Sequence, residues 1–158
     1  MARSKAAGKG ANPPAVPRIF FLLYSLIALL ALAGLADALY LAILHLTGQS
    51  ALCGGSASCS EVLASRYAHL GPVPVAAFGV LGYFTVFASA VFAVFRYARA
   101  RLVLVVAVAF MFLGTLWFLF VQAVLLHQYC RFCLFSAAIT FLLTGLVVAM
   151  PLPSRSPR

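Results

Sequence analysis

Four cysteines in two close pairs carry the chemistry that this sequence predicts. Cys130 and Cys133 stand at the junction of two long apolar runs. If the second run begins as a helix at Cys130, residues i and i+3 lie on one face, about one turn apart. A disulfide between them can open and close with little backbone movement. Free N–H groups at a helix N-terminus favour a thiolate, so the spacing predicts a redox-active pair.

The second pair, Cys53 and Cys59, lies in the only substantial loop of the sequence, residues 47–74. The residues between the two cysteines are all small, so the segment can close a disulfide without strain. Residues 62–67 are predicted to form a short amphipathic helix on the mouth of the protein. Two disulfide-capable pairs favour electron transfer by thiol–disulfide exchange. In a membrane, the lipophilic two-electron acceptor for such a chain is a quinone.

Two other interpretations of the cysteines stay open. All four could bind zinc, but the spacing of Cys53 and Cys59 is wider than zinc ligands usually have, and we expect no metal. Alternatively, both pairs could be structural disulfides in a non-enzymatic, disulfide-stapled membrane protein. The loop pair suits that role, whereas a disulfide from Cys130 to Cys133 would close almost no loop.

The composition places these cysteines in a membrane. Of 158 residues, 65% are hydrophobic and only 8% are charged, against roughly a quarter charged in soluble domains. The net charge of +9 would suggest nucleic acid in a soluble chain. Here the cations are better explained as topology signals and contacts to anionic lipid headgroups. We therefore expect membrane lipid as a partner and no nucleic acid.

The apolar runs predict an all-α integral membrane protein, a bundle of four transmembrane helices. The expected helices are residues 19–46, 75–95, 102–127 and 132–150, each long enough to span a bilayer. The loop at residues 47–74, with its short helix, would cap a quinone pocket. Residues 19–150 would form one transmembrane domain between a disordered basic tail, residues 1–18, and a second cytoplasmic tail, residues 151–158.

The distribution of Lys and Arg orients this bundle. Nine of the eleven fall in the two tails and the connection at residues 96–101, while Arg66 and Arg131 fall on the other side. The positive-inside rule then places both termini in the cytoplasm and all four cysteines on the periplasmic or extracellular side. Thiols become oxidised on that side, so we expect a multi-pass protein of a bacterial inner membrane.

A quinone pocket would lie between helices near the second cysteine pair, with apolar walls and a few polar groups. Position beside the cysteines suggests three cofactor contacts: Phe132, Ser136 and Gln122. Asp37 and Tyr40, one turn apart on the first helix, are further polar candidates, although each could form a helix–helix hydrogen bond instead. Cys130 would be the outermost residue of the last helix, and Cys133 lies one turn, roughly 4.5 Å, deeper. We therefore expect Cys130 to exchange with the loop pair and Cys133 to reduce the quinone.

An ordered set of motifs resembles the bacterial form of the vitamin K epoxide reductase family, over about residues 35–146. Its elements are the loop cysteine pair, Ser65-Arg66-Tyr67, Gly71-Pro72-Val73-Pro74 with Gly79, and Cys130-Arg131-Phe132-Cys133. The resemblance implies a four-helix bundle around a quinone, ubiquinone or menaquinone, with Ser65 near the quinone. DsbB-type oxidases, which do the same work, carry the CxxC motif in their first outer loop, whereas here it comes last.

The resemblance also implies an electron route. A DsbA-like thioredoxin-fold protein would pass electrons to Cys53 and Cys59, and these would reduce the Cys130–Cys133 disulfide, with Cys133 facing the quinone. The enzyme would thereby re-oxidise its periplasmic partner and support disulfide bond formation. No thioredoxin domain follows the last helix, so we expect a separate partner.

The alternative activity within this resemblance is vitamin K epoxide or quinone reduction. The animal branch has an asparagine at the position of Val75 and a tyrosine at that of Ala137. Both departures argue against epoxide reduction.

Overall fold

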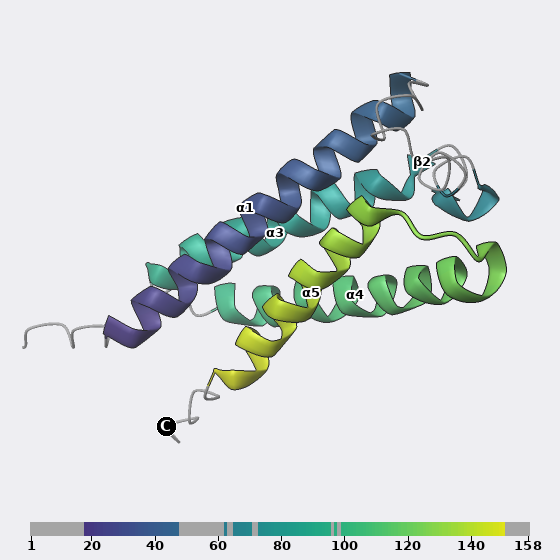
Figure 1. Cartoon of the computed structure of the whole chain (residues 1–158). Coiled ribbons are helices and arrows are strands. Elements are labelled where there is room, and N and C mark those ends of the chain that lie inside the picture. The colour runs from purple at the N-terminus through teal and green to yellow at the C-terminus, as the bar shows by residue number, and fades with distance from the viewer. Residues whose placement is uncertain are drawn as a thin grey trace, which may run out of the picture.

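A computed structural model of the chain describes residues 18–47, 62, 65–70, 73–95, 97 and 99–150. It contains four long apolar helices, α1 (Arg18–Thr47), α3 (Val75–Val94), α4 (Ala100–Phe120) and α5 (Arg131–Ala149) (Figure 1). Each is long and apolar enough to cross a membrane, α4 together with the turn that follows it. The predicted all-α, four-helix membrane bundle is therefore confirmed. Both predicted tails, apart from Arg18, lie outside the described residues, and so do Cys53 and Cys59.

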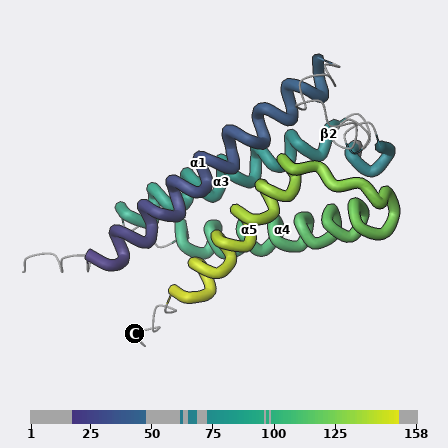
Figure 2. The backbone as a smooth tube through the Cα atoms, viewed as in Figure 1, coloured from purple at the N-terminus to yellow at the C-terminus, as the bar shows by residue number. Residues whose placement is uncertain are grey.

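Successive helices run in opposite directions along the bundle. The start of α1 and the end of α5 lie at one end, as the tube in Figure 2 shows. Arg101 at the start of α4 donates a hydrogen bond to the carbonyl of Met150 just after α5, at 3.4 Å. We call this the terminal end of the bundle. The opposite end, where α5 begins at Arg131, is called the cysteine end.

Three short elements lie between α1 and α3. A 3-10 turn, η2 (Arg66–Ala68), leads into β1 (His69–Leu70), which pairs antiparallel with β2 (Val73–Pro74). Pro74 then directly precedes α3 with φ −68°, an angle that the proline ring fixes in advance. The sequence predicts that this proline-containing segment ends the loop, but it does not predict the strand pairing.

Small residues bring α1 and α3 into close contact. The ring of Tyr83 on α3 lies directly over Gly34 on α1, so that a Cβ at Gly34 would overlap the ring. A Cβ at Gly79 would stand 3.4 Å from the Cβ of Ala38. Backbones that approach this closely gain van der Waals contact, which is a main source of helix association in membranes. This interface forms the most closely packed part of the bundle.

The third span packs differently, because α4 meets the other helices mainly in its first half. Its buried residues are Ala100, Leu104 and Val108, and none of its residues from 109 to 120 is buried. Figure 1 shows α4 diverging from α1 and α3 toward the cysteine end. A cavity lined by residues of α3 and α4 lies between these two helices.

A π-helical turn, η3 (Val121–Leu126), ends this span. It stops at His127, whose φ of 53° lies in the left-handed region. The carbonyl of Gln122 accepts hydrogen bonds from the N–H groups of both His127 and Gln128, the latter at 3.2 Å. The chain thereby turns back toward α5. The sequence predicts a helix to residue 127 but gives no sign of the π-helical turn.

Candidate active site

The structure fixes Cys130 by a hydrogen bond from the preceding span. Cys130 is the N-cap of α5, and its carbonyl accepts the N–H of Leu134 at 3.0 Å. Its own N–H donates to Oε1 of Gln122 at 3.1 Å. Gln122 is buried, with 1% of its surface exposed. The amide of the π-helical turn therefore sets the position at which the last helix begins.

The thiol of Cys130 is covered. Cys130 has 0% exposure and packs in a cluster with Leu44 of α1 and Val62 of the loop. From the sequence, this thiol is predicted to lie at the outer end of the last helix, where a loop thiol could approach it from water. Its place at the helix start is as expected, but the apolar cover separates it from water. Cys133, one turn further along α5, is half-buried.

A cavity of about 750 Å³ lies alongside Cys133. Its walls come from all four helices and are mostly apolar. It extends from Ala68 and Pro74 at the cysteine end to Thr85 and Leu102 nearer the terminal end. Its lining includes Leu81 and Phe110, which are 63% and 74% exposed. The cavity therefore opens sideways between α3 and α4, onto the surface that would face lipid.

Three hydroxyl groups meet in the cavity wall. The Tyr83 hydroxyl donates to the Ser136 carbonyl at 2.8 Å and lies 2.8 Å from Ser136 Oγ and 3.0 Å from Thr140 Oγ1. The Thr140 hydroxyl also donates to the Ser136 carbonyl, at 3.0 Å. All three residues line the cavity together with Cys133. We call them the hydroxyl cluster, and it is the main polar feature shared by α3 and α5.

Of these three residues, only Ser136 is predicted from the sequence, and Tyr83 and Thr140 are not. A signal for both is present in the spacing. Ser136 and Thr140 follow Cys133 at i+3 and i+7, so the three share one face of α5. Tyr83 likewise follows Gly79 by one turn, on the α3 face that meets α1.

The other expected quinone contacts lie outside the cavity lining. Phe132, Gln122 and Ser65 are placed around Cys130 rather than in the cavity wall. Ser65 Oγ donates to the carbonyl of Val62 at 2.7 Å, which places it beside the residue that covers Cys130. The structure thus separates the predicted contacts into one cavity residue and three residues near the outer thiol.

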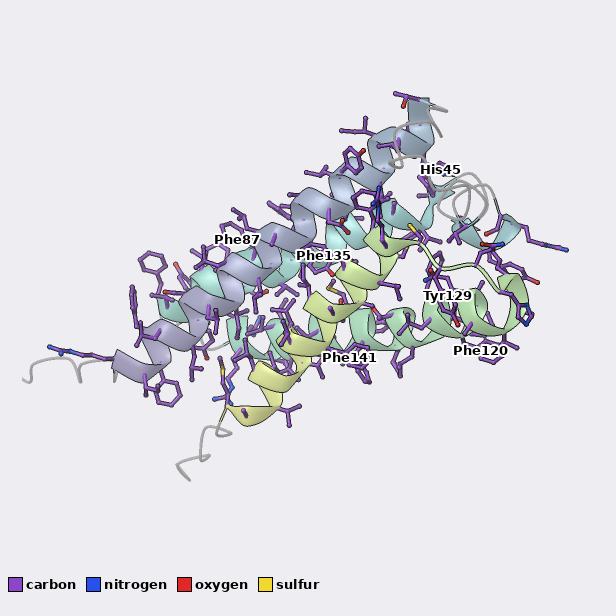
Figure 3. All side chains as sticks on the ribbon, in the orientation of Figure 1. His45, Phe87, Phe120, Tyr129, Phe135 and Phe141 are labelled. Carbon is purple, nitrogen blue, oxygen red and sulfur yellow. The ribbon has the colours of Figure 1, made fainter. Side chains whose placement is uncertain are left out.

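Phe132 joins two neighbours on the outer surface of the bundle. Its ring centroid lies 5.3 Å from that of Tyr40 on α1. The guanidinium of Arg131 stands over the same ring, 5.4 Å from its centroid. Figure 3 shows the side chains at this end, with His45 near the outer end of α1 and Tyr129 in the link before α5. His45 also lines the cavity.

Comparison with protein-family models decides the affiliation. The model of the vitamin K epoxide reductase family matches residues 25–148. The chain belongs to the vitamin K epoxide reductase family. Members of this family are quinone-reducing oxidoreductases, and membership implies a quinone-linked thiol–disulfide oxidoreductase with thioredoxin-like redox partners. No curated protein matches the chain in a search by sequence.

The cavity fits the quinone that vitamin K epoxide reductase family members use. Its volume of about 750 Å³ lies within the range of ligand pockets, and its lining is predominantly apolar. The hydroxyl cluster supplies hydrogen-bonding groups of the kind that would orient a quinone carbonyl. Cys133 borders the same space. Cys133 therefore borders a space whose size and polarity suit a quinone.

Proposed function

We propose that this protein re-oxidises a separate, periplasmic DsbA-like thioredoxin-fold protein and passes the electrons to ubiquinone or menaquinone. In this proposal the two cysteine pairs act in series and support disulfide bond formation outside the cytoplasm. One observation carries it: Cys133 borders a large apolar cavity that opens to the membrane, while Cys130 stands one turn nearer the cysteine end. A purely structural disulfide would not require a cavity of this kind beside one of its sulfur atoms.

The cysteines perform the transfer by successive thiol–disulfide exchange. A thiolate of the Cys53–Cys59 pair attacks Cys130, which breaks the Cys130–Cys133 bond and releases Cys133 as a thiolate. The second loop thiol then attacks the mixed disulfide, which closes the loop disulfide and frees Cys130. Cys133 lies in the first turn of α5, where free N–H groups and the helix dipole would favour negative charge on its sulfur. A bound quinone supplies the two-electron acceptor for the reduced pair.

The cavity has a polar part, at the hydroxyl cluster, and an apolar part that opens sideways, and we assign a different role to each. Tyr83, Ser136 and Thr140 would hold the polar end of the acceptor beside Cys133. The apolar remainder, which reaches Thr85 and Leu102, would take an isoprenoid tail. Because Leu81 and Phe110 are exposed at the opening, the tail could enter from lipid. Ser65, Phe132 and Gln122 would then act on the acceptor indirectly, by positioning Cys130.

Two residues favour quinone reduction over epoxide reduction. Val75 lines the cavity, at the position where the animal branch has an asparagine. Ala137 is buried, at the position of the animal tyrosine. Neither side chain offers a hydrogen bond to an epoxide oxygen, so this chain lacks both of those polar groups.

The proposed orientation follows the positive-inside rule. Among the described residues, Arg18, Arg99 and Arg101 belong to the terminal end, and Arg66 and Arg131 belong to the cysteine end. The terminal end, with its excess of positive charge, would face the cytoplasm. Membrane-impermeant thiol reagents applied to intact, reduced cells should then label Cys53 or Cys59. Labelling only after lysis would reverse the arrangement.

Replacing one cysteine at a time tests the electron route in the purified protein. Cys133→Ser should abolish quinone reduction and accumulate a mixed disulfide between Cys130 and a loop cysteine. Cys130→Ser should form no mixed disulfide of that kind, because the attacked sulfur is gone. Cys53→Ala should stop oxidation of a thioredoxin-fold substrate. A mixed disulfide on Cys133 instead of Cys130 would reverse the assigned roles, and unchanged activity in every variant would leave only a stapled protein.

A further inference from the structure

The first helix faces the cavity with a row of residues that ends in a histidine. Ala38, Leu41 and His45 all line the cavity and stand at i, i+3 and i+7 on α1. Residues with this spacing share one face of a helix. The sequence suggests Asp37 and Tyr40 as candidate polar contacts from this helix, but neither is part of the cavity lining. Among the described residues of α1, His45 is therefore the polar side chain that borders the cavity.

The last helix faces the same cavity with a row of equal spacing. Cys133, Ser136 and Thr140 also stand at i, i+3 and i+7, and all three line the cavity. The two helices run antiparallel (Figure 1), so His45 lies toward the cysteine end and the hydroxyl cluster toward the terminal end. Each Cβ tilts toward the N-terminus of its own helix. The side chains of His45 and Ser136 therefore lean toward each other along the cavity.

A ring contact between the two helices sets the separation of these groups. The rings of Tyr40 and Phe132 lie 5.3 Å apart between centroids, which puts these two residues at about one level. His45 lies five residues beyond Tyr40, and Ser136 lies four residues beyond Phe132 in the opposite direction. At the rise of an α-helix, these steps separate His45 from Ser136 by about 13 Å along the bundle. Cys133, one residue after Phe132, lies between them in depth.

A para-quinone matches this separation. Its two carbonyl oxygens lie on opposite sides of the ring, about 5 Å apart, and a hydrogen bond of about 2.8 Å at each oxygen extends the span to about 11 Å. Because the side chains of His45 and Ser136 lean inward, the remaining difference of about 2 Å is within their reach. A quinone held at both carbonyls would therefore have its ring at the depth of Cys133.

Within the hydroxyl cluster, one proton is left for a ligand. Each hydroxyl group carries a single proton. The hydroxyls of Tyr83 and Thr140 both donate to the Ser136 carbonyl, at 2.8 and 3.0 Å. The Ser136 hydroxyl, 2.8 Å from the Tyr83 oxygen, is therefore the donor that can turn toward the cavity. The cluster can thus hold one carbonyl of a quinone, and the other carbonyl needs a second donor.

We propose that His45 is this second donor and binds the quinone carbonyl opposite the one held by Ser136. The proposal rests on the proposed quinone-linked function. An imidazole has two ring nitrogens, so a hydrogen bond made by one of them leaves the other for a ligand. With both carbonyls held, the ring lies beside Cys133, and the isoprenoid tail leaves sideways between α3 and α4. His45 thereby determines which part of the acceptor meets the sulfur.

Two other hydroxyl side chains line the cavity. The Thr85 hydroxyl donates to the carbonyl of Leu81 in its own helix, at 2.7 Å, which uses its proton. Thr115 on α4 is the competing donor for the second carbonyl. The test must therefore distinguish His45 from Thr115.

Infrared difference spectroscopy of quinone bound to the oxidised protein tests the contact without turnover. The probe is a short-chain ubiquinone or menaquinone, whichever the full-length protein binds more tightly, with ¹³C at one ring carbonyl or at the other. A hydrogen bond lowers the stretching frequency of a carbonyl, so its loss raises that frequency. His45→Leu should raise the frequency of one carbonyl, and Ser136→Ala that of the other. If both variants shift the same carbonyl, or His45→Leu shifts neither, the proposal is overturned.

The affinity for the same probe gives a second readout. His45→Leu should raise the Kd about tenfold, as expected for the loss of one hydrogen bond. His45→Gln keeps an N–H donor of similar reach and should restore most of the affinity and the lower carbonyl frequency. The control is His127→Asn, at a histidine outside the cavity lining whose left-handed backbone asparagine also adopts, and both readouts should stay unchanged. A shift of the second carbonyl in Thr115→Val but not in His45→Leu would assign the contact to Thr115 and contradict the proposal.

These outcomes are distinct from a failure of the proposed function. If the native chain neither binds nor reduces a quinone, the proposed function fails and the His45 contact fails with it. If quinone is reduced while His45→Leu leaves both carbonyl frequencies unchanged, only the His45 contact is refuted. If His45→Leu does not fold, His45→Asn takes its place, because its shorter amide does not reach as far and should give the same shift.

Discussion

The two faces of α3 pack in opposite ways, although both are apolar. Toward α1, Gly34 and Ala38 lie against Tyr83 and Gly79, and the contact is closed. Toward α4, the helices separate and leave the cavity beside Cys133. The span that includes α4 is the most apolar of the four and has the smallest share of buried residues. The apolar character of a helix therefore makes it able to span the membrane, whereas small residues at an interface allow two helices to pack closely.

The largest effect should come from filling the closed face. Gly34→Leu would place a side chain where the Tyr83 ring lies, and overpacking of this kind costs about 3 kcal/mol. The matched control is Gly145→Leu, because a Cβ at Gly145 meets nothing within 4 Å. Thermal unfolding in detergent should show a clear loss of stability for the first variant only. Equal losses in both would mean that the α1–α3 contact does not hold the bundle together.

Loss of the hydrogen bond between Gln122 and Cys130, which joins the span containing α4 to the start of α5, should give the next largest effect. Gln122→Leu removes the acceptor of the Cys130 N–H and leaves a buried donor unsatisfied, at a cost of about 2 kcal/mol. Alkylation of Cys130 should also become faster, since the start of α5 is no longer fixed. Gln128→Leu serves as control, because Gln128 bonds to Gln122 only through its backbone N–H. An unchanged alkylation rate in Gln122→Leu would mean that the Gln122 amide does not control access to the Cys130 thiol.

Filling the open face should impair binding while leaving folding intact. Gly114 lines the cavity, and a Cβ at this position would meet nothing within 4 Å. Gly114→Leu should raise the quinone KM about tenfold, equivalent to about 1.4 kcal/mol of lost binding. The unfolding temperature should match that of Gly114→Ala within error. A KM that does not change would place the quinone elsewhere in the protein.

The smallest effect should come from the hydroxyl that joins the two faces. Tyr83→Phe keeps the ring over Gly34 but removes the hydrogen bonds to Ser136 and Thr140. Stability should fall by only about 1 kcal/mol, because Thr140 retains its bond to the Ser136 carbonyl. Chemical denaturation measures the loss, with Tyr97→Phe, in the connection before α4, as control. A loss as large as that of Gly34→Leu would mean that the hydroxyl, rather than the ring, holds the closed face.

The sequence predicts the four spans because a run of apolar residues is a strong, local signal. It does not predict the divergence of α4, since side chains that face lipid and those that face protein are equally apolar. The cover of Leu44 and Val62 over Cys130 depends on contacts between distant residues. No local pattern encodes such contacts.

The candidate site is predictable to the extent that one helix encodes it. Ser136 follows Cys133 by one turn, and the structure brings both to the cavity wall. Tyr83 reaches the same wall from α3 only because Gly34 on α1 leaves room for its ring. Three helices are needed to place that hydroxyl, so spacing within one segment cannot reveal it.

The cover over Cys130 has a kinetic consequence for a redox enzyme. A sulfur shielded by Leu44 and Val62 is insulated from glutathione, peroxide and other small solutes that would divert its electrons. In the proposed relay, a thiol of the Cys53–Cys59 pair belongs to the same chain and would act at a high effective concentration. In that relay, exchange within the chain would be favoured over loss of electrons to the redox buffer outside.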